Sequence, residues 1–488
     1  MNFGTKFINL LVGTRPFKNL HSTTTAVVVT KRRKCVNQGR RAASTLSLTV
    51  IRDVSYANHH KRNVLDIYDP INTRETVNEE TKGKDSNNRK SVAIYVHGGL
   101  WMRGSKDQSF LSRWDIISNI YGEFQSSSAK SESDRSSEVN SSPNENGLSK
   151  YSNVGLTLAS SGIKTYVVNY RLLEGSGPAH PHQVLDVARA IAFVMQKEQK
   201  ESNGHCPRLS IIGYSAGAHL TSLALTDLKY LNLALMERGL QSRHAHQMIR
   251  AYIALSGVFN LKRLSHSFLK DITIVPAFLG RRLGSSDKSG GDDAEIANKN
   301  DEQILLESSP LHLLLSANKR IRNVSEKEDL NEFPTSDSVG IPLIAQIPIL
   351  LLNAESDFHL HSDSRDLMVA LQQFDSIQED VPNRHHEVMP NRHHLSIMWD
   401  FGVGFWNAEE WSEVHNKNDE YSDNVKKLRQ NERSAEVNSI GSWLSSTAGQ
   451  MASSVTSYIV GANEKDNVAS AVLTFVKKAS YQDDSDKI

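Results

Sequence analysis

The sequence Gly-Tyr-Ser-Ala-Gly at residues 213–217 decides the fold class of this chain. The apolar run Leu-Ser-Ile-Ile at 209–212 precedes it, and an apolar stretch of helical character follows from residue 218. A G-x-S-x-G pentapeptide between a strand and a helix is typical of a nucleophile elbow, in which the serine sits at the tip of a sharp turn. Side chains at positions 213 and 217 would collide with neighbouring backbone in such a turn, which accounts for the two glycines. Ser215 is therefore the candidate nucleophile.

A second motif lies upstream, where residues 91–96 predict a buried strand that runs into His97, Gly98 and Gly99. Esterases of the α/β-hydrolase fold carry an HGG motif after their third strand, and its loop supplies backbone N–H groups to the oxyanion hole. The other donor is the residue after the nucleophile, here Ala216. We predict Gly98, Gly99 and Ala216 as the oxyanion hole; a simple Gly-Gly turn at a strand end is the alternative.

The acid that orients the catalytic base is expected after a later strand. Serine is a weak nucleophile until a base takes its proton, and the base needs a carboxylate to fix its tautomer. In this fold the chain order is Ser, then Asp or Glu, then His. The apolar run 347–352 predicts a strand, and Asp357 stands shortly after it. Asp357 is the predicted acid, with Glu355 and Asp363 as alternatives.

The base is expected in the loop after the last strand, which residues 386–389 predict. Two adjacent histidines, His393 and His394, occupy that loop. The helical pattern that begins at Leu395 favours His394 as the base, and His393 stays open. No Cys or His/Asp/Glu cluster has a recognisable metal-ligand spacing, so we expect neither a metal nor a cofactor.

Apolar runs and helical segments alternate along the chain. Together they predict an α/β fold whose mostly parallel central sheet is covered by helices on both faces. The helical spacing of apolar side chains between residues 468 and 476 predicts a last helix on the sheet. The predicted strands cover residues 92–96, 165–168, 209–212, 252–255 and 349–352, and a representative helix covers 183–196.

The chain resembles α/β-hydrolases of the hormone-sensitive-lipase or carboxylesterase type (BD-FAE-like) from about residue 50 to 406. Segments 63–70, 97–101 and 213–219 are similar to both prenylcysteine methylesterases and kynurenine formamidases, and 249–261 is more similar to the methylesterases. The resemblance implies a serine hydrolase that cleaves a carboxylic ester through an acyl-enzyme, on the pattern of a prenylcysteine methylesterase.

The alternatives to that activity are an arylformamidase acting on N-formylkynurenine and an inactive hydrolase fold used as a binding protein. His97, Trp101 and Tyr214 are the candidate pocket residues. Known prenylcysteine methylesterases are bound to membranes, whereas this sequence has no run of about 18 apolar residues that could span a bilayer. This weakens the methylesterase assignment and leaves the esterase assignment unchanged.

The chain has 488 residues, more than one α/β-hydrolase core needs. We predict a catalytic domain over 49–478 with insertions at about 125–150, 268–340 and 407–466, and a tail at 479–488. The first insertion is almost entirely polar, which predicts disorder. The second contains apolar segments and is a candidate cap over the pocket, with surface helices as the alternative.

The first 52 residues hold ten basic side chains and no acidic one, with many Ser and Thr. This composition predicts that residues 1–48 form a transit peptide, mitochondrial in preference to plastid, or a disordered leader; a cytoplasmic or membrane-associated protein is the alternative. The net charge of +1 and the two distant cysteines indicate neither a nucleic-acid partner nor a disulfide framework. The expected partner is a small-molecule ester or amide substrate. Oligomeric state does not follow from the sequence.

Overall fold

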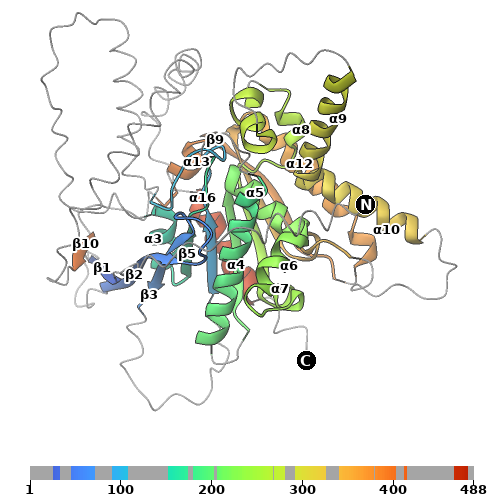
Figure 1. Ribbon diagram of the computed structural model, residues 1–488. Helices are drawn as coiled ribbons and strands as arrows, with labels where there is room; N and C mark the ends of the chain where they lie inside the picture. Colours follow the sequence, from blue (N-terminus) through green and yellow to red (C-terminus); the bar gives the residue numbers. More distant parts are fainter. Residues whose placement is uncertain are drawn as a thin grey trace, which may run out of the picture.

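The computed structural model describes part of the chain (Figure 1). The described residues are 26–32, 45–71, 91–107, 152–173, 180–202, 206–267, 269–280, 292–325, 340–378, 380–399, 401–402, 411–414 and 467–481.

The described strands form one sheet in the order β10-β1-β2-β3-β5-β4-β6-β7-β8-β9. Neighbours from β5 to β9 pair in parallel, whereas β10, β1, β2 and β3 form antiparallel pairs at the other end. The strands are β1 (Ala26–Arg32), β2 (Thr45–Ser55), β3 (Val64–Pro70), β4 (Ser91–Val96), β5 (Lys164–Val168), β6 (Arg208–Tyr214), β7 (Ile249–Leu255), β8 (Ile349–Ser356), β9 (Arg384–His393) and β10 (Trp411–Val414). The five predicted apolar runs are β4 to β8, and the predicted last short strand is part of β9.

Helices cover both faces of the sheet, and the fold is an α/β-hydrolase fold with a mostly parallel sheet. They are α3 (Asn153–Ser160), α4 (His182–Glu201), α5 (Ala216–Thr226), α6 (Leu228–Met236), α7 (Ser242–Met248), α8 (Leu261–Leu264), α9 (Asp292–Glu307), α10 (Pro310–Ser325), α12 (Leu360–Gln372), α13 (Ser396–Trp399) and α16 (Asn467–Tyr481). A π-helical segment, η5 (Lys270–Leu279), and two 3₁₀ turns, η6 (Leu343–Gln346) and η7 (Asp375–Ile377), complete the set.

The two faces of the sheet carry separate hydrophobic cores, as the period of two along a strand requires. In β4, Ile94 belongs to the core that also contains residues of α4, α5 and α10, while the adjacent Tyr95 belongs to the core with residues of α3 and α16. Every residue of β6 is buried, because helices cover it on both sides. The β4, β6, β8 and β9 strands run in the same direction, so the segments that follow them meet at one edge of the sheet.

Several elements of the structure cross the boundaries predicted for the leader, the insertions and the tail. β1 and the first residues of β2 fall within the predicted leader, and β1 pairs with β2 and with β10. β10 falls within the predicted insertion 407–466, and the insertion 125–150 lies outside the described residues. The predicted last helix is α16, which continues past residue 478 to Tyr481 and packs on β7 and β4.

The predicted cap region at 268–340 contains η5, α9 and α10. α10 packs on α5 and α12, and α9 packs on α8 and η5. Leu314 of α10 and Phe278 of η5 are buried in the core on the α5 side of the sheet. The described part of this region is thus joined to the core, and its role as a cover for the pocket stays a prediction. Among the described residues, no helix is both long and apolar enough to cross a membrane.

Candidate active site

Ser215 sits at a sharp turn between β6 and α5. Its backbone has φ 50° and ψ −117°, a strained conformation for a residue with a Cβ. A Cβ at Gly217 would lie 2.3 Å from the carbonyl oxygen of Val96, and one at Gly213 would lie 2.5 Å from Cα of Ala218. Both contacts are with backbone that cannot move away, so glycine is required at both positions. The turn predicted from the pentapeptide is confirmed.

His394 joins Ser215 to Asp357. The Nε2 atom of His394 lies 2.9 Å from Oγ of Ser215, and its Nδ1 atom lies 2.5 Å from Oδ1 of Asp357. A carboxylate only accepts hydrogen bonds, so Nδ1 carries the proton and Nε2 is left to accept the serine hydroxyl. All three side chains are buried, with at most 8 % of any residue exposed. This geometry suits removal of the Ser215 proton by His394.

The alternative base points elsewhere. His393 forms two hydrogen bonds with Ser396. The backbone N–H of His393 donates to the Ser396 Oγ (2.9 Å), and the ring Nδ1 of His393 accepts from the Ser396 backbone N–H (3.3 Å). The position of His393 is set by the sheet, because this residue of β9 is paired with Ser356 of β8. The next residue, His394, therefore reaches the carboxylate that follows β8.

The two alternative acids are also engaged away from His394. Glu355 is exposed and accepts from the backbone N–H of Asn391 at 2.9 Å. Asp363 pairs with Arg263 at 2.6 Å and accepts from the N–H of Asn260 at 3.1 Å. Of the three candidates in the described part of the chain, Asp357 alone meets the histidine.

The Asp357 carboxylate is hydrogen-bonded by residues of β8, the strand that immediately precedes it. Its Oδ2 atom accepts from Nδ2 of Asn353 (2.9 Å) and from the N–H of Ala354 (3.3 Å). Sequence reasoning missed Asn353. The available signal was a polar side chain at the end of an apolar strand, four residues before the acid.

The predicted oxyanion loop lies against the serine. A Cβ on Gly98 would be 3.0 Å from Cβ of Ser215, so the Gly98 backbone passes next to the nucleophile. Within the described residues, no acceptor is paired with the N–H groups of Gly98, Gly99 or Ala216. Ala216 is the first residue of α5, where an unpaired N–H and the positive end of the helix dipole favour negative charge.

The three candidate pocket residues are all buried. His97 donates from Nδ1 to the carbonyl oxygen of Gly98 (2.7 Å) and stacks on Tyr170; burial and the nearby Arg62 lower its pKa to about 3. Tyr214 donates its hydroxyl to the carbonyl oxygen of His394 at 2.8 Å. Trp101 has no exposed surface. Contact of these residues with a substrate stays a prediction.

An apolar side chain that sequence reasoning missed lies beside the histidine. Phe358 follows Asp357, is 42 % exposed, and meets the His394 ring edge to face with 5.2 Å between centroids. Its backbone has a positive φ of 46°.

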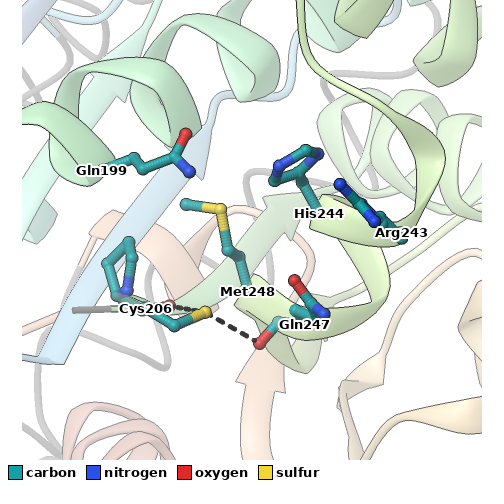
Figure 2. Close-up of a pocket in the computed structure, with 7 residues that line it drawn as sticks. Gln199, Cys206, Arg243, His244, Gln247 and Met248 are labelled. Atoms are coloured by element: carbon teal, nitrogen blue, oxygen red, sulfur yellow. Dashed lines mark hydrogen bonds between the residues drawn. The ribbon is translucent and has the colours of Figure 1, made fainter. Parts of the chain in front are cut away.

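A pocket of about 330 Å³ lies elsewhere, lined by residues of α4 and α7 and the segment before β6 (Figure 2). Cys206 precedes the amino end of β6, whereas Ser215 follows its carboxyl end. A seven-residue strand spans about 23 Å, so this pocket is at the opposite edge of the sheet. No group of three or more potential metal ligands occurs among the described residues.

The BD-FAE family model matches residues 139–289, a segment that contains the serine turn and α5. Residues 139–289 are thus similar to the BD-FAE family, within a chain that has the α/β-hydrolase fold. The BD-FAE family is of the carboxylesterase type. The matched segment ends before Asp357 and His394, so the family match bears on the serine and the fold around it.

Solved structures similar to this chain include several esterases. A truncated carbohydrate esterase from gut microbiota is 16 % identical, with 73 % of this chain and 95 % of that chain covered and a TM-score of 0.39. An inhibited esterase B from Lactobacillus rhamnosis is 14 % identical, with 83 % and 90 % covered and a TM-score of 0.39. A putative carboxylesterase from Lactobacillus plantarum is 11 % identical, with 74 % and 87 % covered and a TM-score of 0.31. No curated protein matches the sequence.

Proposed function

We propose that this protein is a serine hydrolase that cleaves a carboxylic ester through an acyl-enzyme. The observation that carries the proposal is the hydrogen-bonded chain from Ser215 through His394 to Asp357. The BD-FAE match and its carboxylesterase type support the ester as the class of substrate.

In the first half of the reaction, Nε2 of His394 takes the Ser215 proton while Oγ attacks the ester carbonyl. The N–H groups of Gly98 or Gly99 and of Ala216 bind the oxyanion of the tetrahedral intermediate. Collapse of the intermediate breaks the bond to the alcohol oxygen, which receives the proton from His394. The acyl group remains on Ser215.

In the second half, His394 takes a proton from water, and the resulting hydroxide attacks the acyl-enzyme. The second tetrahedral intermediate expels Ser215 Oγ, which regains its proton, and the carboxylic acid leaves. Asp357 keeps His394 in the tautomer whose Nε2 can accept a proton, and it stabilises the imidazolium that forms in both halves of the reaction. Loss of one oxyanion donor is expected to lower turnover by about 10²–10³.

The nucleophile is tested with a fluorophosphonate probe, which reacts with an activated serine. Wild-type protein should be labelled, and Ser215→Ala should not. Ser222→Ala, on the same helix, is the matched control and should label normally. Labelling that persists in Ser215→Ala would refute the nucleophile, and an unreactive wild-type protein would favour an inactive fold used for binding.

Acid and base are tested with two matched pairs. Asp357→Asn should lower kcat by about 10⁴ because it no longer fixes the histidine tautomer, whereas Glu355→Gln should be close to wild type. His394→Asn should lose turnover, whereas His393→Asn should keep most of it. The assignments fail if either control variant loses more activity than its partner.

For the substrate, we propose a methyl ester of a prenylated cysteine, on the strength of the sequence resemblance. The exposed apolar ring of Phe358 beside His394 supports a substrate with an apolar part. Purified protein is offered a short-chain nitrophenyl ester, a prenylcysteine methyl ester and N-formylkynurenine. Turnover of the formamide alone would replace the esterase by an arylformamidase.

We also propose a mitochondrial leader, which the basic, acid-free first 52 residues support. Cleavage at residue 48 would remove β1 from the sheet, while cleavage before Ala26 would keep it. Amino-terminal sequencing of the protein isolated from mitochondria distinguishes the two. Recovery of the full-length chain from another compartment would contradict the proposal.

A further inference from the structure

The loop that carries Gly98 and Gly99 has an unusual backbone. Gly99, Leu100 and Trp101 have consecutive positive φ values of 125°, 56° and 63°. Only glycine adopts such values freely, so Leu100 and Trp101 each cost free energy that the surrounding structure must supply. A strained loop of this kind keeps its conformation only where contacts with the surrounding structure stabilise it.

Trp101 is held at both its backbone and its ring. Its carbonyl oxygen accepts from Nε2 of Gln183 (2.6 Å) and from the N–H of Leu173 (3.0 Å). Its indole Nε1–H donates to Nδ1 of His219 at 3.3 Å, and the ring meets Phe278 edge to face. The side chain is fully buried, so the bond to His219 is the indole's polar contact inside the core.

His219 is fixed in the tautomer that this bond needs. Its Nε2 lies 2.8 Å from the carbonyl oxygen of Ser308, which can only accept, so Nε2 carries the proton and Nδ1 is the acceptor. Burial lowers the pKa of His219 to about 4, which keeps the ring neutral at neutral pH.

His219 also belongs to the nucleophile side of the site. Its backbone N–H donates to the carbonyl oxygen of Ser215 at 3.0 Å, in the first turn of α5. His219 is therefore part of the helix that supplies the Ala216 donor, and through Trp101 it also contacts the loop that supplies Gly98 and Gly99. The triad chemistry described above does not use His219.

We propose that Trp101 and His219 are positioning residues that set the distance between the two halves of the oxyanion hole. The indole-to-imidazole hydrogen bond locks the strained loop against α5, so that the N–H groups on both sides face the same oxyanion. This inference rests on the proposed function, because it concerns the transition state of that reaction.

Two variants of His219 test the contacts of its two ring nitrogen atoms separately. In His219→Asn, the amide oxygen occupies the place of Nδ1 and can still accept from Trp101. In His219→Gln, the amide occupies the place of Nε2, keeps the bond to Ser308 and leaves the indole N–H without its acceptor. Trp101→Phe removes the N–H from the other side and keeps an aromatic ring.

Hydrolysis of a nitrophenyl ester and the rate of fluorophosphonate labelling are measured for wild type, the three variants and Trp101→Phe/His219→Gln. We expect kcat to fall on the order of tenfold in Trp101→Phe and His219→Gln with KM little changed, a fraction of the loss caused by removing an oxyanion donor. His219→Asn should rescue most of the activity. The double variant should lose no more than either single variant, because the two changes remove one bond.

Wild-type kcat in Trp101→Phe and His219→Gln, additive losses in the double variant, or equal losses in His219→Asn and His219→Gln would each overturn the inference. Melting temperatures are recorded for every variant, and a kcat loss that follows the melting temperature instead of the retained acceptor also overturns it. If wild-type protein neither hydrolyses the ester nor labels, the proposed function itself has failed.

Discussion

The hydroxyl of Tyr214 donates a 2.8 Å hydrogen bond to the backbone carbonyl oxygen of His394. The residue immediately before the proposed nucleophile thus holds the loop of the proposed base, 180 positions away in the chain. The two rings also lie near each other, 5.4 Å between centroids. Burial, with the nearby Asp357 charge, raises the pKa of Tyr214 well above its usual value, so the hydroxyl stays protonated and able to donate.

Tyr214→Phe should therefore loosen the His394 loop while it keeps the aromatic packing. The loss of one buried hydrogen bond should lower the free energy of unfolding by about 1–2 kcal/mol, and kcat should fall several-fold. Tyr95→Phe is the matched control, because the partner of the Tyr95 hydroxyl among the described residues is the weakly accepting sulfur of Met398, at 3.9 Å. Denaturant titration and ester turnover are the measurements, and equal effects in both variants would contradict this role of Tyr214.

Gly217→Ala should prevent the turn from forming. Its Cβ would meet the carbonyl oxygens of Val96 and His97 at 2.3 and 2.4 Å, so β4 or α5 would have to move. We expect loss of soluble protein or of fluorophosphonate labelling. Gly239→Ala is the control: its φ of +69° costs about 1–2 kcal/mol, but its Cβ has open space. Gly217→Ala protein with normal labelling would show that the turn tolerates a side chain.

The stability of the protein should fall as pH drops below about 6.5. Burial lowers the pKa of His97 to about 3 and of His219 to about 4, whereas both imidazoles have pKa values near 6.5 when the chain is unfolded. The unfolded state therefore binds more protons between about pH 6.5 and pH 4, and each histidine costs up to about 1.4 kcal/mol per pH unit there.

Urea titrations at pH 7.0 and 5.5 measure that loss. His219→Asn should show a smaller loss between the two pH values than wild type, because it removes one of the titrating groups. His385→Asn, at an exposed position, is the control for the substitution itself. A wild-type unfolding free energy that is the same at both pH values would contradict the prediction.

Lys106→Met should destabilise the protein strongly. Nζ of Lys106 lies 3.0 Å from Asp53, 2.9 Å from Asp66 and 3.0 Å from Asp107, and both Lys106 and Asp66 are almost fully buried. Removal of the lysine leaves the Asp66 carboxylate without its central partner, at an expected cost of about 3–5 kcal/mol.

Addition of Asp66→Asn to Lys106→Met should recover part of that loss, because the second change removes the buried negative charge. Thermal unfolding of the two single variants and the double variant measures it. A double variant less stable than Lys106→Met alone would show that the carboxylate is satisfied by its other neighbours, such as Arg52 and the backbone N–H of Asp53.

Local patterns in the sequence predicted the parallel strands, the serine turn and the order of the site residues. Such patterns work here because β4 to β8 are buried on both faces and are therefore continuously apolar. The helical pattern that begins at Leu395 favoured His394 over His393, but the distances that distinguish the two depend on the pairing of β9 with β8, which no local pattern contains. The bond between Trp101 and His219, 118 positions apart, was likewise out of reach. β1 was assigned to a leader because its flanking residues are basic, although Ala-Val-Val-Val-Thr also suits a strand.

The order of the strands has a consequence for the protein during its synthesis. Ser215 is made 179 residues before His394, and the base arrives only when β9 joins the sheet edge beside β8. A nascent chain that already has its serine turn thus lacks the group that would activate it. The protein should stay inert toward esters on the ribosome, and probe labelling of stalled chains of increasing length would report the moment at which the sheet closes.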